Sequence, residues 1–187
     1  MHKAENQMVP YTKKMPALDI IKSKIYSREA LLKQLPVWRF NDQKLVFTNG
    51  CFDIIHLGHI DYLAKASDLG DELIVGINSD ASVKLLNKGN SRPLQDEQSR
   101  ALIIASLHFV TAVVLFDEET PQALIGVIKP NVLVKGADYD ANEINAKNKR
   151  FIVGSDSVRA AGGIVKTLDY LEGYSTSAIE QKIKTSF

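Results

Sequence analysis

The sequence predicts a single-domain α/β fold in which a doubly wound, parallel, five-stranded sheet follows an N-terminal helical extension. The first observation is that short apolar runs rich in strand formers alternate with segments whose apolar residues recur at helical spacing. Such alternation is typical of parallel sheets with right-handed crossovers. The second observation is the length of 187 residues, which allows one well-buried core.

The N-terminal residues 1–40 are expected to form a separate extension of the main domain, residues 41–187. Residues 1–19 have few apolar residues and no period, so we expect a mobile tail there. Residues 20–35 have helical spacing, with Ser27 as the cap of a second segment. Pro36 is expected to end that helix.

The main domain is then expected to alternate between strands and helices. Residues 72–78 are the clearest strand, because a nearly continuous apolar run indicates burial on both faces. The expected strands are 44–47, 72–78, 110–116, 131–135 and 164–169. The expected helices are 59–69, 81–86, 95–107, 120–129, 155–161 and 175–183, with loops at 87–93, 141–151 and 170–174.

Residues 44–66 form the stretch around which the chain is organised. The strand is followed by a predicted turn at residues 48–50 and then by a helix after Gly58. A helix N-terminus carries unpaired N–H groups and partial positive charge, so it attracts phosphate. His56 and His59 lie at the same place and can donate hydrogen bonds to phosphate oxygens that gain charge in a transition state.

A second run of hydroxyl side chains begins the last predicted helix, at residues 175–177. Hydroxyls and free N–H groups meet there, so two helix N-termini at one sheet edge can clamp a triphosphate between them. The alternative interpretation is ordinary N-capping of a terminal helix. Two surface histidines near a turn are the corresponding alternative for His56 and His59.

Composition and charge exclude several classes of protein. A net charge of +1 gives no reason to expect nucleic acid or an anionic membrane as a partner. No apolar run approaches the ~20 residues of a membrane span. The single cysteine, Cys51, excludes an internal disulfide and fits a cytoplasmic location. We interpret it as a small residue in a tight loop, with a nucleophilic role as the alternative.

The motifs resemble those of the nucleotidyltransferase superfamily, which has a Rossmann-like fold. Gly-Cys-Phe-Asp at 50–53 followed by His-Leu-Gly-His at 56–59 is similar to its signature, with the right spacing between the two halves. Residues 171–177 are similar to its second motif, R-T-E-G-I-S-T-T. Tyr170 and Leu171 stand where that pattern has Arg and Thr, so the arginine's phosphate contacts are not carried over.

One branch of the superfamily fits best. Segments 47–56, 78–80, 91–93, 134–139 and 172–176 resemble the adenylyltransferase module of ADP-heptose synthase. The resemblance covers roughly residues 27–183, and residues 142–151 are longer and more basic than the pattern. In many bacteria a sugar kinase domain precedes this module. About 40 residues precede it here, too few for such a domain, so we expect the stand-alone form.

The resemblance implies transfer of AMP from ATP to a sugar 1-phosphate, most specifically D-glycero-β-D-manno-heptose 1-phosphate, for bacterial lipopolysaccharide or surface glycans. Mg²⁺ is expected with ATP, without a dedicated protein metal site. The implied catalytic residues are His56, His59 and Lys84. The implied nucleotide-binding residues are Thr48, Asn49, Gly50, Cys51, Phe52, Asp53, Gly58, Arg100, Lys135, Gly136, Ser175, Thr176 and Ser177, and the acceptor-binding ones are Arg92, Asp138 and Tyr139.

Several of these roles have alternatives. Asn49 and Asp53 either shape the loop or touch the acceptor. Solvated surface charge is the alternative for each lysine and arginine, and it is the favoured interpretation of Lys88. His108 has no motif around it, so we interpret it as structural.

Three functions remain open from the sequence. The first is the heptose 1-phosphate adenylyltransferase. The second is another small-molecule nucleotidyltransferase, such as a glycerol 3-phosphate cytidylyltransferase or a flavin-nucleotide adenylyltransferase. The third is a nucleotide-binding module without catalysis. The expected partners are ATP and a sugar 1-phosphate, without nucleic acid or membrane, and apolar residues in the extension favour a homodimer or a higher homo-oligomer.

Overall fold

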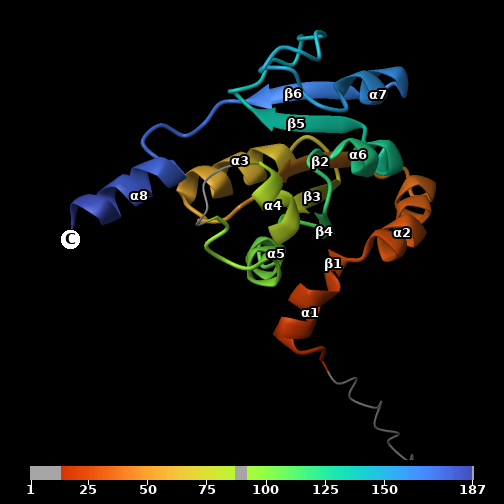
Figure 1. Cartoon of the computed structure of the whole chain (residues 1–187). Helices are drawn as coiled ribbons and strands as arrows, with labels where there is room; N and C mark the ends of the chain where they lie inside the picture. The colour runs from red at the N-terminus through yellow and green to blue at the C-terminus, as the bar shows by residue number, and fades with distance from the viewer. Residues whose placement is uncertain (1–13, 87–91, 187) are drawn as a thin grey trace, which may run out of the picture.

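The computed structural model describes residues 14–86 and 92–186 (Figure 1). Residues 1–13, which hold most of the predicted tail, and residues 87–91 of the predicted loop, including Lys88, lie outside the described residues. The strands are β1 (Ile25–Tyr26), β2 (Leu45–Gly50), β3 (Glu72–Asn78), β4 (Ala112–Phe116), β5 (Val132–Gly136) and β6 (Ile164–Leu168). The helices are α1 (Ala17–Ser23), α2 (Arg28–Phe40), α3 (Leu57–Ser67), α4 (Asp80–Leu85), α5 (Glu97–Ala105), α6 (Gln122–Ile128), α7 (Ser155–Ala160) and α8 (Thr176–Thr185).

The strands form one parallel sheet in the order β1-β4-β3-β2-β5-β6. The predicted doubly wound α/β fold is therefore confirmed, and all five predicted strands are present. The sheet also has a sixth strand, β1, which pairs with β4. Ile25 and Tyr26 lie inside the segment for which helical spacing was predicted. They are good strand formers beside an open sheet edge, and Ser27 then begins α2 by accepting a hydrogen bond from the Ala30 N–H.

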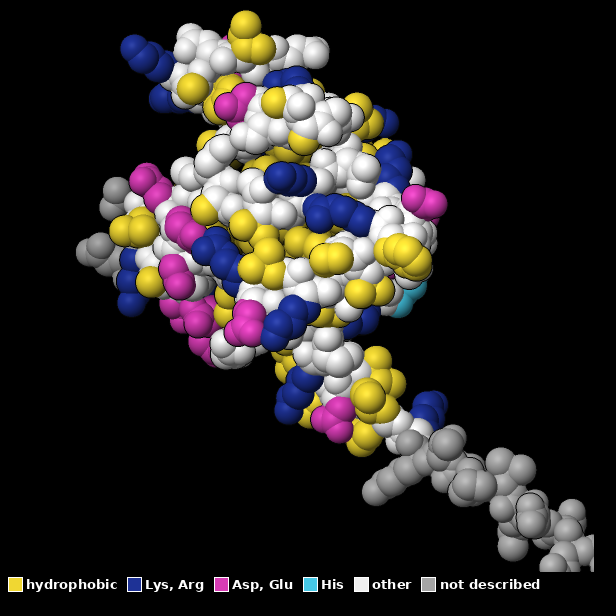
Figure 2. All heavy atoms as spheres, turned by 90° about the vertical axis from the view of Figure 1, so that its right-hand side faces the viewer, with side chains coloured by type: hydrophobic (Ala, Val, Ile, Leu, Met, Phe, Trp, Pro, Cys, Tyr) yellow, Lys and Arg dark blue, Asp and Glu magenta, His cyan; other side chains and the backbone are white. Residues whose placement is uncertain are grey.

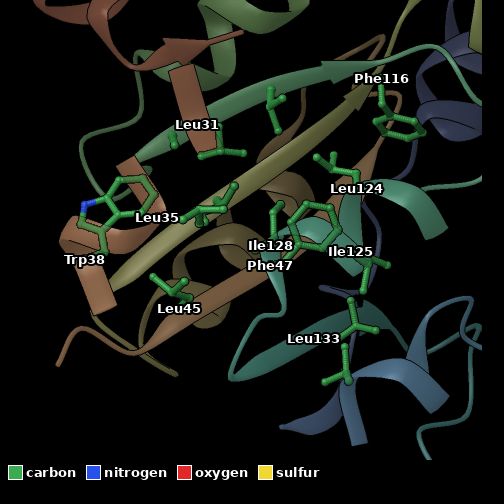
Figure 3. Close-up of a cluster of buried hydrophobic side chains, with 14 of the residues drawn as sticks. Leu31, Leu35, Trp38, Leu45, Phe47, Phe116, Leu124, Ile125, Ile128 and Leu133 are labelled. Carbon is green, nitrogen blue, oxygen red and sulfur yellow. The ribbon is translucent and has the colours of Figure 1, made fainter. Parts of the chain in front are cut away.

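Helices cover both faces of the sheet, as the alternation of side chains along each strand requires. On one face, Phe47 and Leu133 of the strands pack against α2 and α6 (Figure 3). On the other face, Val46 and Val75 pack against α3 and α5. Neighbouring residues of β2 thus point into different cores, which explains why its sequence is apolar without alternation.

The predicted end of the helix at Pro36 was wrong. Pro36 does not end a helix, because α2 continues to Phe40. Leu31, Leu35 and Trp38 lie buried along one side of α2 on both sides of the proline, and their packing stabilises the continuous helix. Pro36 itself is exposed, so water can reach the carbonyl group whose helical hydrogen bond it removes.

The predicted turn at residues 48–50 was also wrong, because these residues continue β2. Thr48, Asn49 and Gly50 stand opposite Val75, Gly76 and Ile77 of β3. The pairing with a neighbouring strand overrides the turn preference of Asn and Gly. The following helix begins at Leu57 rather than His59, so Gly58 and His59 both belong to its first turn.

The helices at the two ends of the chain differ from the rest in their burial. Neither α1 nor α8 contains a buried residue, and α8 extends away from the sheet (Figure 1). Figure 2 shows hydrophobic side chains scattered among lysines and arginines on one face, with α1 projecting below it. Leu18 of α1 and Val37 of α2 are exposed apolar residues. Oligomerisation through the extension stays a prediction.

Candidate nucleotide-binding site

The loop after β2 is folded around a buried phenylalanine. Phe52 adopts a positive φ of 50° and is only 6% exposed. A Cβ atom on Gly50 would lie 3.1 Å from the Phe52 ring, so glycine leaves the room that this ring occupies. The chain then reaches His56, the N-cap of α3, whose carbonyl accepts the His59 N–H at 2.9 Å.

His56 and His59 are stacked at the start of α3. Their ring centroids are 3.8 Å apart with the planes inclined by 30°, and the Phe52 ring meets His59 edge-on at 5.5 Å. The Nδ1 atoms of both histidines are buried without a hydrogen-bond partner among the described residues. Burial lowers the pKa of His56, and burial together with the neighbouring His56 lowers the pKa of His59 to about 4. Both imidazoles are therefore neutral at pH 7.

The N-terminus of α8 meets the N-terminus of α3. Ser175 is the N-cap of α8, and its hydroxyl accepts the Ala178 N–H at 3.0 Å. A Cβ atom on Gly58 would lie 3.2 Å from the Tyr174 carbonyl oxygen and 3.1 Å from the His56 ring. Two helix N-termini with free N–H groups thus converge, which produces a local preference for anions.

A cavity of 910 Å³ runs along the carboxyl edge of the sheet at this point. Parallel sheets bind ligands at that edge. The predicted site residues that line the cavity are Asn49, Gly50, Cys51, Phe52, His56, Gly58, His59, Lys135, Gly136, Asp138, Tyr139, Ser175 and Thr176. Residues far apart in the sequence, from the ends of β2, β5 and β6, therefore meet at one cavity.

Lys135 carries the positive charge in this wall of the cavity. Its Nζ donates to Asn49 Oδ1 at 2.5 Å and lies 5.4 Å from the centre of the Tyr139 ring. Tyr170 Oη donates to Asp138 Oδ2 at 3.2 Å. Burial, followed by the Asp138 carboxylate, raises the pKa of Tyr170 to about 12, so the phenol keeps its proton at neutral pH.

Asp53 lies beside the cavity and organises the loop that precedes α5. Its carboxylate, only 8% exposed, accepts the N–H groups of Leu94 and Gln95, each at 2.9 Å, and the Arg92 guanidinium at 2.5 Å. Burial acts to raise the pKa of Asp53, but the bonds from Gln95, Leu94 and Arg92 outweigh it and lower the pKa. Arg92 also forms an ion pair with Glu180 of α8.

Arg100 is completely buried and contacts the loop at residues 51–56 between β2 and α3, here called the signature loop. Its guanidinium donates to the carbonyl oxygens of Cys51 and Asn78, both at 2.7 Å, and to the Asp80 carboxylate at 2.7 Å. These bonds fix the ends of β2 and β3 relative to α5. Arg100 is not among the residues that line the cavity.

Four other predicted site residues are also outside the cavity lining. Thr48 is buried and shares a hydrogen bond of 2.7 Å with the Tyr62 hydroxyl. Arg92 is held by its two carboxylates, and Lys84 is exposed on α4. Ser177 follows Thr176 on α8 but does not line the cavity.

The sequence-based prediction missed the cavity residues that follow β4 and two of the tyrosines in the lining. Glu119, Thr120 and Pro121 follow β4 and line the cavity on the side of β3. The rule that ligands bind at the carboxyl ends of parallel strands could have found them, because they directly follow the predicted strand 110–116. Tyr170 and Tyr174 also line the cavity, but aromatic residues in a loop give no comparable signal.

Residues 14–86 and 92–186 contain no group of three or more His, Cys, Asp or Glu side chains arranged to hold a metal ion. Within the same residues, none of the helices has the length and apolar character needed to cross a membrane.

Comparisons with known proteins assign this chain to a family. The cytidylyltransferase-like family model matches residues 47–182. The chain is 50% identical over 163 residues to the bifunctional protein HldE of Wolinella succinogenes, covering 87% of this chain and 32% of that protein. It is 53% identical over 161 residues to HldE of Campylobacter jejuni, covering 86% and 32%. The chain therefore spans about a third of the length of these relatives.

Solved structures agree with the sequence relatives. A lipopolysaccharide core biosynthesis protein from Thermoplasma volcanium superposes with a TM-score of 0.53 at 30% identity, covering 71% of this chain and 99% of that one. The pantoate-beta-alanine ligase of Francisella tularensis superposes with a TM-score of 0.52 at 17% identity, covering 86% and 76%, and shows the fold alone. The chain is an enzyme of the nucleotidyltransferase class and belongs to the cytidylyltransferase-like family.

Proposed function

We propose that this enzyme transfers AMP from ATP to a sugar 1-phosphate, most specifically D-glycero-β-D-manno-heptose 1-phosphate. The products are ADP-heptose and pyrophosphate, for bacterial lipopolysaccharide or surface glycans. One observation carries the proposal: the N-termini of α3 and α8 converge beside two neutral histidines in one cavity. The choice of acceptor is supported by the motif resemblance to ADP-heptose synthase, by the relatives named HldE and by the similarity to a lipopolysaccharide core biosynthesis protein.

The proposed reaction is an in-line displacement at the α-phosphorus of ATP. An oxygen of the sugar phosphate forms the new bond to phosphorus while the bond to the β-phosphate oxygen breaks, and pyrophosphate leaves with that electron pair. The attacking oxygen already carries negative charge, so no general base is needed. Orientation of the two substrates and stabilisation of concentrated negative charge are then the main tasks of the protein.

The residues around the cavity suit these tasks. In this proposal His56 and His59 donate hydrogen bonds to the triphosphate as neutral imidazoles, and Lys135 supplies a positive charge. The N–H groups after Ser175 bind the β- and γ-phosphates. Donors that the fold holds in fixed positions need little reorganisation when negative charge develops, which strengthens their effect.

The remaining residues divide into two groups. Asp138 and Tyr139 line the cavity, where a carboxylate and a phenol can recognise acceptor hydroxyls. Direct substrate contacts by Lys84, Arg92, Arg100 and Ser177 stay predictions, since these side chains do not line the cavity. Asp53 and Thr48 support the loop from behind in this proposal.

Mg²⁺ enters as the magnesium complex of ATP and so belongs to the substrate. Magnesium prefers several hard oxygen ligands, and the triphosphate supplies them. The cavity lining includes the imidazoles of His56 and His59 and the Lys135 ammonium, which suit the phosphates. Because ATP is available in the cytoplasm, we propose that the enzyme works there.

A panel of substrates tests this proposal by pyrophosphate release. ATP with D-glycero-β-D-manno-heptose 1-phosphate is the test pair, CTP is the control nucleotide, and glycerol 3-phosphate is the control acceptor. Fast release with the test pair alone supports the proposal. Release with CTP or glycerol 3-phosphate contradicts the heptose assignment, and no release with any pair contradicts catalysis with this panel.

A further inference from the structure

The helix that carries Ser175 has very little anchoring of its own. None of the α8 residues is buried, and only Thr176, Ile179 and Glu180 are partly covered. These positions are separated by three and four residues, so they form a single narrow face of the helix. A helix held in this way opens and reorients at low cost unless specific contacts fix it.

Among the described residues, two contacts link α8 and its start to other elements of the domain. One is at its start, where the Tyr174 carbonyl approaches Gly58 of α3. The other is one turn further along, where the Glu180 carboxylate forms an ion pair with Arg92. A single contact at the start would leave the helix free to pivot, whereas two contacts define its direction.

The partner of Glu180 is itself held rigidly. The Arg92 side chain is 15% exposed, and its other terminal nitrogen is bonded to Asp53, which is 8% exposed. Asp53 also binds the N–H groups of Leu94 and Gln95, and the Gln95 side chain donates to the Asp53 carbonyl at 2.5 Å. Arg92 therefore connects α8 to the signature loop.

We infer that Glu180 is a positioning residue, whose ion pair with Arg92 sets the direction of α8 and holds the N–H groups after Ser175 against the first turn of α3. This inference rests on the proposed function, which places the triphosphate between those two helix starts. Donors that must meet phosphate oxygens lose much of their effect when they are displaced by about 1 Å. Glu180 touches no substrate in this account and acts only through the helix.

The test compares Glu180→Gln with Gln181→Ala. The first change removes the charge at almost constant shape, and the second alters an exposed neighbour on the same helix. Hydrogen exchange of the α8 amides in the ligand-free enzyme reports docking, and calorimetric titration with magnesium ATP reports the phosphate site. We expect Glu180→Gln to speed up α8 exchange and to weaken ATP binding about three- to tenfold, the usual range for coupled contacts. Gln181→Ala is expected to change neither.

A double-mutant cycle separates positioning through Arg92 from a general effect on the helix. In an Arg92→Met background, Glu180→Gln is expected to cause no further loss of ATP affinity. An equal loss in both backgrounds would overturn the inference, and so would unchanged α8 exchange in Glu180→Gln. Faster exchange with unchanged ATP affinity would also overturn it, because α8 would then not position phosphate donors. Absence of ATP binding in the unaltered enzyme would instead refute the proposed function, while the exchange data still report docking.

Discussion

His56 and His59 stack with their ring centroids 3.8 Å apart at the first turn of α3, with their Nδ1 atoms buried and unpaired among the described residues. Two cationic imidazoles at this distance would repel strongly, and burial further disfavours the charge. In the proposed function, the pair acts as neutral hydrogen-bond donors to the triphosphate. An approaching triphosphate would both satisfy the rings and make their protonation easier.

Replacement of His59 by alanine removes one donor to the transition state. We expect His59→Ala to lower kcat roughly 10²- to 10³-fold, the usual loss for one such donor. His108→Ala is the matched control, because His108 is exposed and outside the cavity lining. Steady-state pyrophosphate release measures both variants. Turnover within a few-fold of the original enzyme in His59→Ala would contradict the catalytic assignment.

The lowered pKa values of the two histidines predict how stability depends on pH. A histidine that stays neutral in the folded state binds protons more readily when the chain unfolds. The contribution of such a histidine to the free energy of unfolding is therefore complete above the ordinary pKa of 6.5. It is lost as the pH falls toward the pKa in the folded state, which is about 4 for His59. Urea unfolding should give a smaller free energy of unfolding at pH 5 than at pH 7.

A variant identifies the source of that pH dependence. His59→Gln removes the titrating ring, so its free energy of unfolding should fall less between pH 7 and pH 5 than that of the original enzyme. Asp and Glu residues with ordinary or lowered pKa values remain mostly ionised over this range. Equal slopes in the two proteins would show that His59 is not responsible.

Gly58 tests whether the two helix starts must approach closely. In Gly58→Ala, the new methyl group meets the His56 ring at 3.1 Å and the Tyr174 carbonyl oxygen at 3.2 Å. One of these groups must shift, so we expect a loss of ATP affinity and turnover. Gly126→Ala is the control, since that position in α6 has no atom within 4 Å of the added Cβ among the described residues. It should keep full activity and gain roughly 0.5–1 kcal/mol of stability. Full activity in Gly58→Ala would mean that the approach is not functional.

Arg100 is expected to affect folding more than substrate contact. Arg100→Met leaves the Asp80 carboxylate and the carbonyl groups of Cys51, Asn78 and Gln95 without this donor, which should cost about 3–5 kcal/mol of unfolding free energy. The exposed Arg150→Met should change stability by less than about 0.5 kcal/mol. Chemical unfolding measures both variants. Equal stability of Arg100→Met and the original enzyme would contradict the structural role.

Local sequence patterns predicted most strands and helices of the fold and the residues at the centre of the candidate site. The alternation of apolar runs and helical segments predicted five of the six strands, and the hydroxyl run predicted the start of the last helix. His56 and His59 were identifiable because glycine, histidine and a helix start occur together within a few residues. These features depend on neighbours in the sequence, so the sequence displays them directly.

The missed features depend on contacts between distant residues. β1 forms because β4 offers an open edge, and Pro36 stays inside α2 because Leu35 and Trp38, which precede and follow it, are buried in the core. The internal position of Arg100 follows from carbonyl groups of two strands, which no local pattern indicates. A charged residue in a helix is ordinarily expected at the surface, and only the folded arrangement shows that this one is fully paired.

Isotopic labelling tests the central claim, nucleotidyl transfer, most directly. The enzyme is incubated with magnesium and D-glycero-β-D-manno-heptose 1-phosphate, and with ATP labelled with ³²P at either the α- or the γ-phosphate. The proposed function predicts that the α-label appears in the sugar nucleotide and that the γ-label appears only in pyrophosphate. Transfer of the γ-label to the sugar, or retention of both labels in ATP, would contradict it.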